Sequence, residues 1–159
     1  MVPSLRINPS VGKKNLGFTL LEVLITMTII GILTAVAAPS FITFIKRDRL
    51  VTNSNQLHSV FKFARSEAIK RNQTVSVKTS NNQWQVQTAI NSTQTTLNIF
   101  EVTHSSISVD LKDIDISSAG ELDQMYQILV SDSDSTTTDF TLCVLQSGQS
   151  WLVEAPETC

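Results

Sequence analysis

The chain is short, moderately apolar and close to neutral. It has 159 residues, of which 42% are hydrophobic and 16% are charged, and its formal net charge is −2. A chain of this length forms about one small globular domain, so we do not expect several independently folded domains. It contains two cysteines, which allow a single intramolecular disulfide.

The first predicted element is an apolar helix near the start of the chain. From Phe18 to Ala38 the sequence holds 21 residues, and Glu22 is the only ionisable side chain among them. A helix rises about 1.5 Å per residue, so this stretch matches the roughly 30 Å hydrocarbon core of a bilayer. We therefore expect residues 18–38 to form a transmembrane helix.

Glu22 is the unusual residue of this span. A charged side chain near the middle of a span costs on the order of 3 kcal/mol on insertion scales, and less near its end, so such a residue is a functional candidate. Glu22 falls in the first turn of the predicted helix, where the helix dipole favours an anion. Two alternatives follow: the carboxylate has a cationic partner, or it lies at the membrane interface without one.

Three basic residues, Arg6, Lys13 and Lys14, all precede the span. The positive-inside rule therefore keeps residues 1–17 in the cytoplasm and exports the rest of the chain.

A secretory signal peptide is an alternative interpretation of the apolar span, because residues 35–37 imitate its cleavage site. Its apolar region would be about 20 residues long instead of the usual 7–15 and would contain a carboxylate, which disfavours it. An anchor helix that is never processed stays open on physical grounds.

The helix is predicted to continue over residues 39–72. Pro39 should kink it by removing a backbone hydrogen bond, and Gly31 lowers local helix propensity. Apolar residues after Pro39 recur at steps of three and four, which indicates an amphipathic helix that packs one stripe against a globular head and ends near Arg71. The stripe consists of Phe41, Phe44, Ile45, Val51, Leu57, Phe61, Ala64 and Ala68.

From residue 73 to residue 159 the apolar pattern changes to a period of two. Residues 74–78 and 83–87 alternate around Ser80-Asn81-Asn82, which predicts a β hairpin. Six further segments have strand character: 97–99, 107–109, 114–116, 126–130, 140–144 and 151–153. We therefore expect a β-rich head with a polar loop over residues 131–139, and an α+β fold for the whole chain.

Charge is unevenly distributed along the chain. Between Lys46 and Lys78 eight basic residues stand against two acidic ones, whereas from Thr79 onward eleven acids stand against Lys112. Such a separation allows the basic stem of one subunit to meet the acidic head of another in a head-to-tail stack. Two independently solvated faces are the alternative.

The two cysteines, Cys143 and Cys159, both fall in the part predicted to be exported. An oxidising compartment would let them form a disulfide, for which the chain-entropy model gives about 3 kcal/mol. A buried thiol with a free terminal one is the alternative. We favour the disulfide, because a terminal cysteine otherwise has no packing reason to be there.

The segment Gly17-Phe18-Thr19-Leu20-Leu21-Glu22 resembles the class III signal of type IV pilins and type II secretion pseudopilins. This resemblance implies that prepilin peptidase cuts between Gly17 and Phe18 and methylates the new N-terminal amine. It also implies that Glu22 pairs with the amine of a neighbouring subunit during filament assembly. The segment from Gly31 to Pro39 would be the part that can unwind in the filament.

A second block, Ala64-Arg65-Ser66-Glu67-Ala68-Ile69-Lys70-Arg71 followed by a hairpin containing Trp84, resembles the GspH/FimT family. Its members have a pilin-like fold, with a long N-terminal helix on a β-rich head. They serve as minor pilins of type IV pili, in the FimT and FimU branches, or as minor pseudopilin H of the type II secretion system. The Cys143–Cys159 pair leads us to favour the pilus. The resemblance also implies a single-pass inner-membrane location, a periplasmic head and incorporation into a filament beside other pilin or pseudopilin subunits.

One branch of the family is similar to a DNA receptor with an Arg-rich segment near its C-terminus. This chain has Gly148-Gln149-Ser150-Trp151 there, and no basic residue follows Lys112. Since sequence-independent DNA affinity comes mostly from phosphate neutralisation, we do not expect DNA as a partner. Any weak contact would come from Arg65, Lys70 and Arg71.

The sequence does not favour an enzyme, a cofactor or a metal. His58 and His104 are the only histidines, and no serine lies in a nucleophile-elbow or triad-like context. The segment 132–136 alternates oxygen ligands but lacks the glycine and closing glutamate of a calcium loop. We therefore expect a structural filament subunit.

The class III pattern makes a direct prediction about processing. The mature protein should begin with N-methylated Phe18, because Gly17 precedes it behind a basic leader. Intact-mass measurement and N-terminal peptide sequencing check this. An N-terminus at Ala38 would instead establish a secretory signal peptide.

Overall fold

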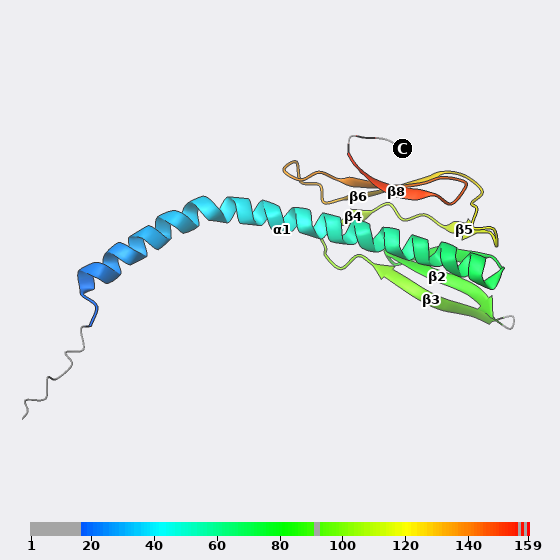
Figure 1. The fold of residues 1–159 in the computed structure, drawn as a ribbon, viewed down its shortest axis with the longest axis horizontal. Helices are drawn as coiled ribbons and strands as arrows, with labels where there is room; N and C mark the ends of the chain where they lie inside the picture. Colours follow the sequence, from blue (N-terminus) through cyan, green and yellow to red (C-terminus); the bar gives the residue numbers. More distant parts are fainter. Residues whose placement is uncertain (1–16, 91–92, 156, 158) are drawn as a thin grey trace, which may run out of the picture. The chain divides into compact units, whose positions relative to one another are not determined.

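The computed structural model describes residues 17–90, 93–155, 157 and 159. The leader expected over residues 1–17 therefore lies outside the described part except for Gly17. The chain divides into two compact units, Met1–Pro39 and Ser40–Cys159, which are described separately below. One helix, α1 (Leu20–Arg71), contributes to both units and continues through Gly31 and Pro39 (Figure 1). The kink expected at these two residues stays a prediction.

In the first unit, α1 satisfies its own polar side chains. The hydroxyl groups of Thr26, Thr28 and Thr34 donate to the carbonyls of Val23, Leu24 and Ile30 at 2.8–2.9 Å. A hydroxyl that bonds within its own helix avoids most of the penalty for leaving water. By length and composition, α1 is suited to cross a membrane. Glu22 is the one ionisable side chain of residues 18–38.

The C-terminal end of α1 is fixed by a local hydrogen-bond pattern. Asn72 has a φ of 52°, and its N–H donates to the Ile69 carbonyl while the Gln73 N–H donates to the Ala68 carbonyl, both at 3.2 Å. These two bonds form a Schellman motif, in which a residue in the left-handed region ends a helix. The predicted end near Arg71 is confirmed.

The second unit adds two antiparallel sheets to the helix (Figure 1). One sheet has the order β3-β2-β1-β5 and the other has the order β4-β6-β7-β8. The strands are β1 Val75–Ser80, β2 Gln83–Ile90, β3 Thr93–Glu101, β4 Ser108–Val109, β5 Ile114–Ile116, β6 Tyr126–Ser131, β7 Phe140–Val144 and β8 Ser150–Glu154. The pairing of β1 with β5, which places Val77 opposite Ile114, is not visible in the sequence pattern.

The predicted hairpin is formed by β1 and β2. Ser80 pairs with Gln83, so the turn consists of Asn81 and Asn82, with φ of 48° and 62°. Positive φ at both positions is the geometry of a type I′ turn, which asparagine tolerates better than most residues.

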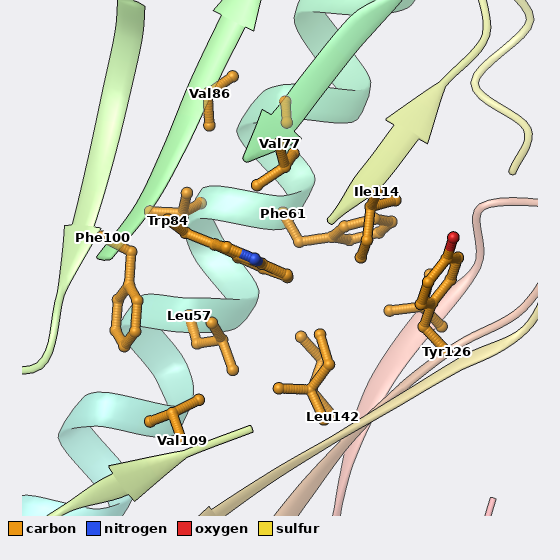
Figure 2. Packing of buried hydrophobic residues seen from close by; sticks show 14 of the residues in the cluster. Leu57, Phe61, Val77, Trp84, Val86, Phe100, Val109, Ile114, Tyr126 and Leu142 are labelled. Atoms are coloured by element: carbon orange, nitrogen blue, oxygen red, sulfur yellow. The ribbon is translucent and has the colours of Figure 1, made fainter. Parts of the chain in front are cut away.

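A single hydrophobic core joins α1 to both sheets (Figure 2). Phe61 of α1 and Trp84 of β2 are fully buried in it, together with Leu142 of β7. The Trp84 indole Nε1–H donates to the Lys112 carbonyl at 2.8 Å, so this large side chain is buried without an unsatisfied donor. The period-two pattern thus places one face of each sheet toward the helix.

The expected apolar stripe begins later along α1 than the sequence pattern suggested. Phe41 and Phe44 are 62% and 65% exposed, so they do not belong to the core of the head. The buried part of the stripe starts at Leu50. Before Leu50, Lys46 and Arg47 form ion pairs with the head. Periodicity alone could not show where the strands would stop covering the helix.

Cys143 of β7 and Cys159 are joined by a disulfide, with a Cα–Cα distance of 5.6 Å. This confirms the expected pairing. The bridge fastens the C-terminal segment, which follows the edge strand β8, back onto the middle of its sheet.

Removing the disulfide should destabilise the head. The bridge spans 16 residues, and losing a bridge of this kind lowers the free energy of unfolding by about 2–5 kcal/mol. Denaturant titration of the full chain in neutral detergent, for the wild type and for Cys143→Ser and Cys159→Ser, measures this. The Cys159→Ser variant isolates the bridge, because it leaves the buried Cys143 in place. A wild-type transition that reductant does not shift would contradict the prediction.

Candidate functional site

The residues around the expected cleavage point lie outside regular structure. Gly17, Phe18 and Thr19 precede α1 and are exposed, with Phe18 84% accessible. A peptidase needs an accessible peptide bond, and both residues of the Gly17–Phe18 bond are exposed. Apart from its neighbours in the chain, no described atom lies within 4 Å of a Cβ built on Gly17, so packing among the described residues does not call for glycine there.

Thr19 and Glu22 start the helix. The Glu22 N–H donates to Thr19 Oγ1 at 3.2 Å, and the Val23 N–H donates to the Thr19 carbonyl at 3.2 Å. Thr19 is therefore the N-cap and Glu22 is the third helical residue, the spacing of a capping box. The sequence form of a capping box is Thr-x-x-Glu, which Thr19 and Glu22 match, but the predictions above did not include it.

The Glu22 carboxylate makes no ion pair within the part of the chain that is described. Its position in the first turn of α1 confirms the expected place for an anion near the positive end of a helix. A lone carboxylate among apolar side chains still carries a desolvation cost. In an apolar environment a cationic partner would reduce this cost.

At the other end of α1, Arg65 ties the helix to two turns of the head. Its Nε donates to the Gly120 carbonyl at 3.0 Å and an Nη donates to the Ser147 carbonyl at 3.3 Å. Gly148, with a φ of 78°, packs so tightly that an added Cβ would lie 2.1 Å from the Gly120 oxygen. Only glycine fits there, so the two turns close directly over the guanidinium.

Glu67 organises the last turn of the helix. Its carboxylate is nearly buried and accepts from Arg71 Nε at 2.6 Å, while Lys70 Nζ lies at 3.6 Å. The hydrogen bond from Arg71 lowers the pKa of Glu67 below its ordinary value. Arg65, Lys70 and Arg71, the candidate DNA contacts, all have bonding partners within the chain, and the DNA contact itself stays untested.

The basic stem and the acidic head pair within one subunit. Lys46 bonds Asp134 in the β6–β7 loop, and Arg47 lies 3.3 Å from Glu154 at the end of β8. The hydrogen bond from Lys46 holds the pKa of Asp134 well below its usual range. Part of the charge separation seen in the sequence is therefore neutralised internally.

The two histidines have local partners. His58 Nε2 lies 2.9 Å from Ser150 Oγ, and His104 Nδ1 lies 2.8 Å from Ser106 Oγ. Burial, and then the charge of Lys62, lower the pKa of His58. The His58–Ser150 contact brings the start of β8 against α1. Among the described residues, no three His, Cys, Asp or Glu side chains are grouped to hold a metal ion.

A helix whose first part is apolar and exposed, and whose second part packs on antiparallel sheets, defines a pilin-like protein. The family described as type II transport protein GspH matches residues 53–155, and the prokaryotic N-terminal methylation motif matches residues 12–38. The chain belongs to the GspH family. The resemblance found in the block from Ala64 to Arg71 is thereby confirmed.

Two solved structures of the type IV minor pilin FimU from Pseudomonas aeruginosa have a similar fold. The first is 15% identical with a TM-score of 0.60, covering 69% of this chain and 92% of that protein. The second is 14% identical with a TM-score of 0.56, covering 65% and 92%. At this identity the likeness establishes the pilin fold. None of the curated protein sequences matches the chain significantly.

Replacing Arg65 should loosen the head from α1. Arg65→Lys keeps the charge but cannot reach both carbonyls, because a single ammonium lacks the guanidinium fork. We expect the free energy of unfolding to fall by about 1.5–3 kcal/mol, measured by denaturant titration in detergent. The exposed Lys70→Met variant is the matched control and should change it by less than about 0.5 kcal/mol. An Arg65→Lys variant as stable as the wild type would contradict this role.

Proposed function

We propose that this protein is a minor pilin of a type IV pilus. Residues 1–17 form a leader that prepilin peptidase removes, residues 18–38 span the inner membrane and later lie in the filament core, and residues 39–72 continue as the helix that carries the head. The head, residues 73–159, lies in the periplasm. The observation that carries the proposal is the Glu22 carboxylate, placed four residues after Phe18 in the first turn of an apolar helix.

The chemistry of the processed end supports this role. Cleavage after Gly17 creates an α-amino group at Phe18, and such a group has a pKa of about 8, so it is cationic at neutral pH. Two ions in lipid reduce each other's desolvation cost when they pair. Since Glu22 has no ionic partner in the described part of its own subunit, the amine of a neighbouring subunit is the natural one. The pair would align adjacent subunits.

Minor pseudopilin H of a type II secretion system is the second candidate. The description of the matching family, a type II transport protein, favours it, whereas the fold likeness to the minor pilin FimU and the Cys143–Cys159 bridge favour the pilus. Deleting the gene distinguishes the minor pilin from the minor pseudopilin. Loss of surface pili with normal protein secretion supports the pilus, and loss of secreted enzymes with normal pili supports the pseudopilus.

In either filament the protein acts as a structural subunit. Its partners are the other pilin or pseudopilin subunits, met through the N-terminal helix, together with prepilin peptidase and the inner membrane. No catalytic step is assigned to the chain. Binding of DNA in natural transformation is a weaker alternative, because all three of its candidate contacts are bonded within the subunit.

If Glu22 pairs with the Phe18 amine of a neighbouring subunit, its substitution should impair filament assembly without impairing membrane insertion. Glu22→Gln and Glu22→Ala should insert at least as well as the wild type, since removing a charge from a span favours insertion. Incorporation into filaments should fall for both variants. Membrane fractionation measures the first quantity, and immunoblotting of sheared, purified filaments measures the second. Wild-type incorporation of both variants would rule out the pairing.

A further inference from the structure

A groove of about 620 Å³ lies between the C-terminal part of α1 and the turn that leads from β7 into β8. We refer to it as the α1–β8 groove. Its lining includes Lys62, Arg65 and Ile69 from the helix, and Gly148, Gln149 and Trp151 from the turn and strand. Apart from Arg65, one of the three candidate DNA contacts, its lining residues have no part in the functions proposed above.

The charge of this groove differs from that of the rest of the head. No acidic residue lines it, although the chain has eleven acids after residue 78. Among the described residues from 40 onward, Arg49, Lys62 and Arg65 are the basic side chains without an ion pair, and the last two line the groove. The groove therefore places two cations of α1 that lack a carboxylate partner side by side, against the acidic head.

The walls of the groove are preorganised and partly apolar. Arg65 is held by the Gly120 and Ser147 carbonyls, so little conformational freedom remains to be lost when a ligand binds. Ile69 is 48% exposed and Trp151 is 38% exposed. A cation beside exposed aromatic and aliphatic side chains is the composition found at the energetic centres of protein interfaces.

We propose that the α1–β8 groove docks an acidic, partly apolar segment of a neighbouring subunit. This inference rests on the proposed function, because a filament supplies such neighbours. Carboxylates of the segment pair with Lys62 and with the free edge of the Arg65 guanidinium, and its apolar side chains lie against Ile69 and Trp151. Charge complementarity identifies the occupant: the held cation of Arg65 and the exposed cation of Lys62, neither of which has a carboxylate partner among the described residues, fit a short anionic segment.

A nucleic acid fits the groove less well. DNA carries about one charge per 1.7 Å along its axis, and its affinity rests on many neutralised phosphates. Glu121 directly follows Gly120, whose carbonyl is bonded to Arg65, and Asp123 follows two residues later. These carboxylates lie on the chain next to the site and oppose a long polyanion, whereas a segment with two or three carboxylates can avoid them.

The fluorescence of Trp151 can report binding in the groove. Trp84 is fully buried and Trp151 is partly exposed, so ligand binding should change the emission of Trp151. The full chain in neutral detergent micelles is titrated with an end-blocked peptide of alternating aspartate and leucine. We expect a saturable change in emission, a loss of affinity when ionic strength rises from about 0.05 M to about 0.5 M, and no saturable change with a lysine–leucine peptide.

Single substitutions test whether the change in Trp151 emission arises from binding in the groove. Lys62→Gln should weaken peptide binding by about three- to fivefold, Lys62→Arg should retain it, and Trp151→Phe should abolish the emission change. Lys70→Gln is the matched control, because Lys70 is on the same helix but outside the lining, and it should bind like the wild type. In cells, Lys62→Glu should lower incorporation into filaments, whereas Lys62→Arg should not.

Several results would overturn the proposal. These are the absence of saturable binding at millimolar peptide, equal affinity in the Lys62→Gln variant, or an emission change that survives Trp151→Phe. Tighter binding of a single-stranded thymidine oligonucleotide than of the acidic peptide would assign the groove to nucleic acid instead. The titration needs no filament, so its failure leaves the pilin assignment intact, and failure of the Glu22 test leaves the groove result intact.

Discussion

The structure depends on one helix that serves two surroundings. The first part of α1 is apolar on every side, and its threonines bond to their own helix, which suits lipid or a bundle of similar helices. From Leu50 onward only one face is apolar, and that face is buried in the head. A single continuous element therefore carries both a part suited by length and composition to span a membrane and part of the core of the folded domain, which a β-sheet with open edges could not do in lipid.

The head is fastened to this helix by polar contacts as well as by its core. Arg65 bonds two turns that glycine allows to approach closely, while Lys46 and Arg47 bind the β6–β7 loop and the end of β8. Exposed ion pairs of this kind contribute little stability individually. The His58–Ser150 contact also holds the start of β8 against α1, and the groove beside Lys62 lies where this strand begins.

The two functional ends of the molecule therefore differ in chemistry. Near Phe18, the Glu22 carboxylate has no cationic partner among the described residues. In the groove, Lys62 and Arg65 have no carboxylate partner among them. Each end is incomplete in ionic terms within the described part of one subunit. In the proposed filament, neighbouring subunits would supply both missing partners.

The sequence by itself determined most of the elements, although β3 begins at Thr93, four residues before the predicted segment 97–99. Periodicity, the Asn72 and Asn81-Asn82 positions and the class III pattern depend on residues close together in the chain, so the helix, its end and the hairpin could be predicted, and the two cysteines allowed only one pairing. Only the tertiary structure decided which strands share a sheet, that Phe41 and Phe44 lie outside the head core, and that Arg65 bonds to carbonyls instead of remaining a free surface cation. These features depend on contacts between residues as far apart as Arg65 and Ser147, and local patterns carry no information about such distant partners.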